Sequence, residues 1–108
     1  MNPRRVHDLM REHFPAFDCA RVEWTNVLER EGPNTQLLDS ILVRHISAAE
    51  VLIEVHRKLG AMVPLAEAAK YISAHIGEGQ IRVADREFTS FVVVARNGVA
   101  TGWGAHDD

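Results

Sequence analysis

The chain has 108 residues, a quarter of which are charged, and its formal net charge is −3 at pH 7. This length suits one domain with its own hydrophobic core, and the balance of apolar and charged residues excludes a disordered chain. The mild acidic balance argues against a sequence-independent nucleic-acid binder, which carries a basic footprint.

The cysteine content and the hydropathy of the chain indicate in which cellular compartment the protein is expected. Cys19 is the single cysteine, so no internal disulfide can form, and a reducing environment is expected. The N-terminus has two arginines but no apolar segment after them, unlike a secretory signal. The longest apolar run, Phe91–Ala95, is too short to span a bilayer. The sequence therefore predicts a cytoplasmic protein without membrane contact.

The sequence pattern predicts a helix at the start of the chain and permits two interpretations of the segment that follows. A helix is predicted over Pro3–Phe14, with its apolar residues on one side and Pro15 ending it. Asp18–Glu31 also follows a helical period and stops before a Gly-Pro pair, which favours a second helix. Alternating side chains leave a short strand over Arg21–Thr25 open.

Three further helices are predicted in the middle of the chain. Asn34 is a good N-cap for the first of them. Ser47 and Glu50 match a capping box, which predicts a helix that continues to Gly60 as its C-terminal stop. The last helix begins at Pro64 or the residue before it and ends at the glycines after residue 76.

The period then changes from about 3.6 to about 2 residues, which marks the start of a sheet. Strands are predicted at Gln80–Val83, Glu87–Ala95 and Val99–Trp103. Asn97-Gly98 between apolar runs predicts a type I′ hairpin turn, with positive φ at both residues.

The predicted fold is therefore α+β, with four to five helices packed on one face of a C-terminal three-stranded antiparallel β-meander. Residues 1–108 form one globular domain, with a helical layer at about 3–76 and the β-meander at about 80–104.

Catalytic and cofactor motifs are not found in the sequence. No two of the six histidines have the i, i+4 spacing of a helical metal site, so no metal is expected. Cys19 lies in no nucleophile signature, and the serines lack a G-x-S-x-G elbow. Gly102-Trp103-Gly104 follows the sheet instead of opening a phosphate loop. We therefore expect neither an enzyme nor a bound cofactor.

A binding function remains. The leading hypothesis is a small cytosolic protein-binding module of the immunity or antitoxin type, which binds and occludes a bacterial toxin with a basic surface. Arginine and tryptophan are enriched in interface hot spots and, with nearby acids, cluster at the predicted strands. The expected partner-binding residues are Glu78, Asp85, Arg86, Glu87, Arg96 and Trp103.

Two other functions stay open. A DNA-binding regulator would use the predicted helix pair Ala48–Leu59 and Pro64–Ile76, although the second helix offers few side chains that read bases. A small enzyme would use a histidine as acid or base. An exposed edge strand, Gln80–Val83 or Val99–Trp103, would also permit a homodimer by sheet extension.

Overall fold

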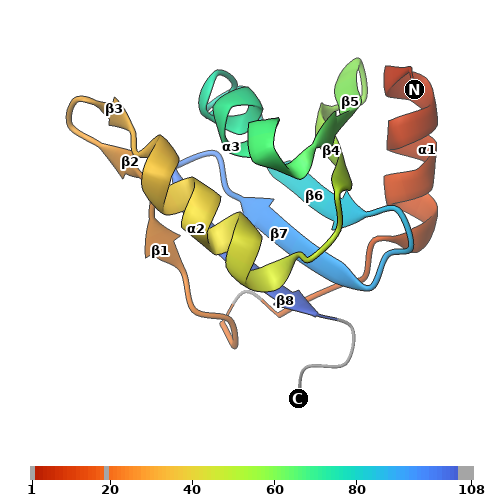
Figure 1. The fold of residues 1–108 in the computed structure, drawn as a ribbon, viewed down its shortest axis with the longest axis horizontal. Coiled ribbons are helices and arrows are strands. Elements are labelled where there is room, and N and C mark those ends of the chain that lie inside the picture. The colour runs from red at the N-terminus through yellow and green to blue at the C-terminus, as the bar shows by residue number, and fades with distance from the viewer. Residues whose placement is uncertain (1, 19, 105–108) are drawn as a thin grey trace.

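The computed structural model describes residues 2–18 and 20–104, which form three helices and eight strands (Figure 1). The helices are α1 (Pro3–His13), α2 (Thr35–His45) and α3 (Leu65–Ser73). The strands are β1 (Thr25–Asn26), β2 (Leu28–Glu29), β3 (Gly32–Pro33), β4 (Glu50–His56), β5 (Leu59–Pro64), β6 (Ile81–Asp85), β7 (Ser90–Val94) and β8 (Val99–Gly104).

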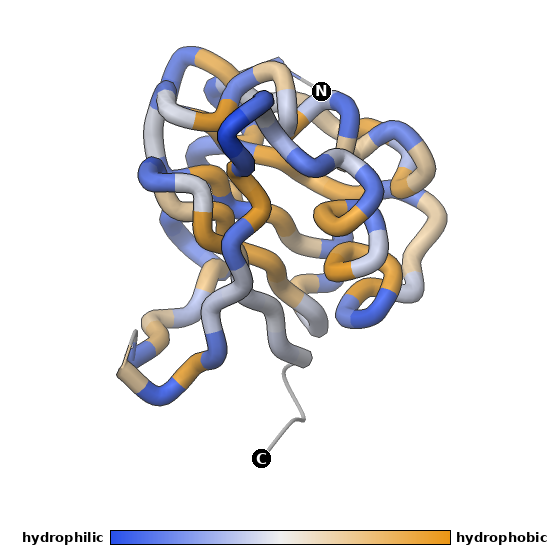
Figure 2. Tube along the Cα trace, turned by 90° about the vertical axis from the view of Figure 1, so that its left-hand side faces the viewer, coloured by the Kyte–Doolittle hydropathy of each residue, from blue (hydrophilic) through white to orange (hydrophobic). Residues whose placement is uncertain are grey.

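Six strands form one antiparallel sheet in the order β1-β8-β7-β6-β4-β5, and β2 and β3 pair separately. The hairpin β4–β5 therefore lies beside the meander β6–β7–β8. Helices α2 and α3 lie side by side on one face of the sheet, and α1 covers the opposite face (Figure 1). Figure 2 shows the hydrophobic residues concentrated along the inner strands.

The two faces of the sheet belong to two separate cores. Ile53 and Val92 pack with α2 and α3, whereas their chain neighbours Leu52 and Phe91 pack with Val6 of α1. Successive strand residues point to opposite faces, so each inner strand supplies both cores. This is why apolar side chains predominate in the middle of the inner strands.

The predicted arrangement of layers is wrong. The α+β class is retained, but the described residues contain three helices in place of four to five, and these cover both faces of the sheet. The sheet has six strands in place of three, because β1, β4 and β5 lie within the expected helical layer at 3–76.

The helix predicted over Ala48–Leu59 is wrong for an identifiable reason. Val51, Ile53 and Val55 are β-branched at alternate positions, and this favours a strand. Leu52 interrupts the face that Glu50, Glu54 and His56 share, so the period of 2 was incomplete and the apolar run at 51–53 also fitted a helix. The helix pair of the DNA-binding alternative is therefore absent, since its first member is β4.

The helix predicted over Asp18–Glu31 is also wrong within the described residues of that range. They contain β1, β2 and turns, and the alternative strand over Arg21–Thr25 reaches strand geometry only at Thr25. Here long-range pairing of Thr25 and Asn26 with β8 determines the conformation, which sequence periodicity does not report.

Other elements are confirmed. α1, α2 and α3 lie where helices are expected, and the side chain of Asn34 accepts a hydrogen bond from the backbone N–H of Leu37. The three C-terminal strands are confirmed with shifted ends. No helix among the described residues is long and apolar enough to cross a membrane.

The hairpin turn at Asn97-Gly98 exists but has a different type. Gly98 has φ +90°, whereas φ of Asn97 is not positive. The N–H of Gly98 bonds to the carbonyl of Ala95, and the N–H of Ala95 bonds to the carbonyl of Val99. This is a three-residue loop whose glycine forms a bulge, in place of the expected type I′ turn.

A buried carboxylate joins the neighbouring inner strands β4 and β6 on the α1 face. Glu54 is 3% exposed, and Nε of Arg82 donates to its Oε1 at 2.9 Å. Nδ1 of His7, from α1, lies 2.5 Å from Oε2 of the same carboxylate. The guanidinium of Arg82 also lies 5.6 Å from the ring centre of Phe14, which follows α1. This network therefore connects α1 to β4 and β6.

We predict that Glu54→Gln lowers the free energy of unfolding by about 3 kcal/mol, because it leaves Arg82 without its counter-charge and removes the carboxylate that pairs with His7. The value is at the lower end of the range for broken buried pairs, since the side chains of His7 and Arg82 stay 29% and 27% exposed. Urea denaturation measures the change. Glu50→Gln, at an exposed glutamate of the same strand, is the control and should have almost no effect.

Phe88 offers a test of backbone strain. It has φ +56° in the β6–β7 turn, a conformation that costs an L-residue about 1–2 kcal/mol. We therefore expect Phe88→Gly to be more stable than Phe88→Ala by about 1 kcal/mol, although both lose the ring. At Glu87, where φ is not positive, the Glu87→Gly variant should be less stable than the Glu87→Ala variant. The same order at both positions would contradict this account.

Candidate functional site

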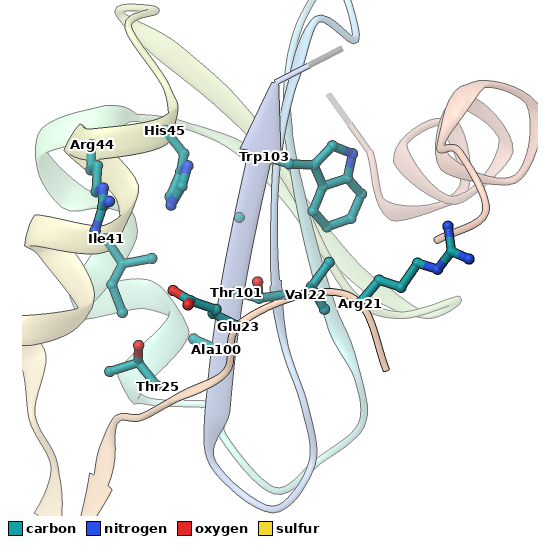
Figure 3. Close-up of a pocket in the computed structure, with 11 residues that line it drawn as sticks. Arg21, Val22, Glu23, Thr25, Ile41, Arg44, His45, Ala100, Thr101 and Trp103 are labelled. Atoms are coloured by element: carbon teal, nitrogen blue, oxygen red, sulfur yellow. The ribbon is translucent and has the colours of Figure 1, made fainter. Parts of the chain in front are cut away.

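A hollow of about 400 Å³ lies at the outer edge of β8. It is bounded by the last turns of α2, by β8 and by residues 21–25, which cross in front of the strand. Figure 3 shows Ile41, Arg44 and His45 on one side of β8 and Trp103 on the other. The volume lies within the range of small-molecule and peptide pockets.

Small residues on β8 create this space. Ala100 packs into the core under α2, and two residues later Gly102 lies directly beneath His45. A Cβ on Gly102 would lie 2.6 Å from Cδ2 of His45 and 3.0 Å from the carbonyl oxygen of Phe91. Because no side chain fits there, the imidazole rests on the strand and the backbone stays accessible.

The backbone of Gly102 faces the hollow. The ladder between β1 and β8 pairs Thr25 with Ala100 and Asn26 with Val99, and it continues no further. The carbonyl of Val99 accepts a hydrogen bond from the N–H of Ala95, which follows β7. Because the backbone groups of successive strand residues point alternately to the two neighbouring strands, the N–H and C=O of Gly102 point away from β7. On the side of β8 that faces away from β7, no residue in the described part of the chain forms a hydrogen bond with these two groups.

Two unpaired charges border the hollow. Arg44, in the last turn of α2, and Glu23, on the crossing segment, are both exposed. Neither forms a hydrogen bond or an ion pair within residues 2–18 and 20–104. Arg21 also lines the hollow, but it pairs with Asp18 at 3.5 Å. The site therefore combines a backbone donor and acceptor with one available cation and one available anion.

Aromatic rings close the α1 side of the site. The ring centres of Trp103 and Phe17 are 4.9 Å apart, and Phe17 also contacts Trp24 at 6.2 Å. Trp103 further contacts Phe14 and Phe91 in the core beneath α1. Of the residues predicted for partner binding, Trp103 alone lines this hollow.

The other five predicted residues lie at opposite ends of the sheet. Arg96, in the β7–β8 turn, donates to the carbonyl of Gly77 at 3.2 Å, which places it beside Glu78. Asp85, Arg86 and Glu87 lie at the other end, where they line a smaller hollow of about 230 Å³ with residues 48–50. The structure therefore separates the six residues into at least two surfaces.

Asp85 has a local structural role. It is 6% exposed, and its carboxylate accepts the N–H groups of Thr89 at 2.7 Å and Ser90 at 3.1 Å, together with the hydroxyl of Thr89. The side chain thus caps the β6–β7 turn and is not available to a partner. Arg86 and Glu87 at the tip of the turn remain exposed.

Sequence reasoning missed Gly102, Arg44 and Glu23 as site residues. The alternation of small residues at Ala100 and Gly102 was a usable signal, because glycine in a strand often marks a close approach. Arg44 gave no signal of this kind, since only the fold brings the end of α2 to β8.

Three histidine–carboxylate pairs among the described residues are relevant to the enzyme alternative. His7 pairs with Glu54, Nδ1 of His75 lies 2.5 Å from Oε2 of Glu78, and Nε2 of His13 lies 3.8 Å from Oε2 of Glu12. His75 also contacts Tyr71, at 5.1 Å between ring centres. Burial raises the pKa of Tyr71, and the charge of Glu78 raises it further. Within the described residues, no group of three metal-ligating side chains comes together. Cys19 and His106 lie outside the described residues.

Comparison of the chain with protein-family models, with curated proteins and with solved structures finds no match. The functional argument therefore rests on the geometry of the site.

The contact between Gly102 and His45 is directly testable. Gly102→Ala should lower the free energy of unfolding by about 1–3 kcal/mol, because the added methyl group overpacks the site. His45→Ala removes the imidazole, so the double variant should lose less stability than the two single changes added together. Thermal and urea denaturation of the four proteins measure the coupling. Additive losses would contradict the packing described here.

Proposed function

We propose that this protein is a protein-binding module without catalytic activity, and that it binds an extended segment of a partner protein at the outer edge of β8. The observation that carries the proposal is the outward backbone of Gly102 in an open, polar hollow. A strand edge with a free donor and acceptor is the usual site for adding a peptide strand.

The hollow supplies side-chain recognition in addition to backbone pairing. A carboxylate of the bound segment pairs with Arg44, and a basic side chain pairs with Glu23. Antiparallel addition of a strand brings such groups within reach on either side of Gly102. The bound segment therefore carries an acidic group and a basic group near one another.

The partner that we propose is a toxin with a basic surface, which the bound protein occludes as an immunity protein or antitoxin does. The net charge of −3 attracts a basic partner over long range. Occlusion requires only that the partner's functional surface lies next to the segment held at β8, and it needs no catalytic group in this chain.

The test is capture from the native host with three tagged proteins. These are the wild-type chain, the double variant Glu23→Arg with Arg44→Glu, and the control Arg57→Glu with Glu87→Arg. Each double variant keeps the net charge, and the control changes exposed residues of the β4–β5 and β6–β7 turns. We expect one stoichiometric protein partner with the wild type and the control, and at least about a tenfold loss with the first variant.

Two outcomes would contradict the proposal. Retention of the partner by the Glu23 and Arg44 double variant would exclude the hollow at β8 as the binding site. Loss of the partner only in the control would place the interface at the β4–β5 turn or at the β6–β7 turn, the second of which the sequence predicted. Circular dichroism of all three proteins establishes that they are equally folded.

A further inference from the structure

The opposite edge of the sheet is formed by β5, and its composition is unusual for an edge. All six residues from Leu59 to Pro64 are uncharged, and a proline occurs only at the last of them. All six residues of β5 pair with β4, whose one register shift lies between Glu54 and His56 on the β4 side, and no strand within residues 2–18 and 20–104 pairs with the other side of β5. Exposed edges usually carry charges, bulges or an internal proline that prevent strand addition.

Both faces of this edge strand are already supported. Val6 of α1 packs against Gly60, where an added Cβ would lie 3.1 Å from Cγ1 of the valine. On the other face, Leu59 and Val63 pack against the core beneath α2 and α3. The backbone edge of β5 is therefore held rigidly between two helices, and only its outward hydrogen-bonding groups lack a covering strand.

Two unpaired charges lie beside this edge. A groove of about 520 Å³ runs between Val63 and α3, and Glu67 and Lys70 of α3 both line it. The two side chains are one helical turn apart and exposed, and neither forms an ion pair within the described residues. If two copies of α3 lie side by side in opposite directions, Glu67 of one copy can therefore pair with Lys70 of the other.

We propose that β5 pairs with β5 of a second copy, in an antiparallel arrangement about a two-fold axis, and so forms a homodimer with one continuous sheet. Such an interface is isologous, so Glu67 of each copy faces Lys70 of the other. This proposal is independent of the partner site, because β5 and β8 lie on opposite sides of the sheet.

The spacing of the elements fits this arrangement. α3 lies over β4 and β5, and it runs back from the end of β5 toward the start of β6. Because α3 contacts β4 and β5 equally, the two helices of the dimer are two strand spacings apart, roughly 10 Å. Packed helices have axes about 8–10 Å apart, so the side chains of Glu67 and Lys70 can meet across the two-fold axis.

The register also fits. A two-fold axis at the middle of β5 lies between Ala61 and Met62, roughly 8 Å from Pro64 at about 3.3 Å per residue. The midpoint of Glu67 and Lys70 lies roughly 7 Å from Pro64 at 1.5 Å per residue of helix. When the two β5 strands pair along their whole length, the midpoint of Glu67 and Lys70 therefore lies close to the two-fold axis. Each glutamate is then placed opposite the lysine of the other copy.

Sedimentation velocity from micromolar to submillimolar concentration tests the dimer, using a charge-swap set on α3. Glu67→Lys alone and Lys70→Glu alone should each raise the dimer dissociation constant about tenfold or more, because each puts two like-charge contacts in the interface. The double variant reverses both charges and should restore the wild-type dissociation constant. Val63→Lys, which places a charge at the edge, should abolish the dimer while circular dichroism shows the variant to be folded, a check that is needed because Val63 also packs against the core.

Val43→Lys is the matched control, because Val43 is a valine on α2 that is 57% exposed and lies away from β5. It should leave the dimer unchanged. A wild-type protein that stays monomeric over the whole range would overturn the proposal. A dimer that survives Val63→Lys, or whose dissociation constant the single charge changes leave unaltered, would also overturn it, because the contact would then be elsewhere.

Discussion

Burial of both faces of β4 is the constraint on which the rest of the structure depends. Val51, Ile53 and Val55 pack beneath α2 and α3, while Leu52 and Glu54 face α1. A strand covered on both sides needs helices on both faces of its sheet. The position of α1 opposite the other two helices follows from this. The single carboxylate among these five residues is tolerated because Arg82 and His7 pair with it.

The same constraint determines where another molecule can bind. With both faces covered, the sheet can be extended only at its edges. These edges differ in chemistry. The edge at β8 is recessed and bordered by Arg44 and Glu23, which suits a segment with polar side chains. The edge at β5 is uncharged along its whole length, which suits an identical strand. Two interactions of different kinds can therefore occur on one small domain.

The sequence predicted the elements that carry local signals. Asn34 marks the start of α2, and the period of 2 marks the C-terminal strands. β4 was mistaken for a helix because Leu52 interrupts its polar alternation and the Ser47 and Glu50 pair imitates a capping box. The candidate site could be predicted least. Gly102 and Arg44 are 58 positions apart in the chain, and only the packing of α2 on β8 brings them to one hollow.

The measurement that tests the central claim most directly is amide hydrogen exchange, followed by NMR in the free protein. The N–H groups of Thr101 and Trp103 point toward β7 and should exchange slowly, whereas that of Gly102 points into the hollow and should exchange far faster. The exchange of Gly102 should then slow when a partner strand binds. If Gly102 is protected as strongly as its two neighbours in the free protein, the outer edge of β8 is closed and the proposed binding site does not exist.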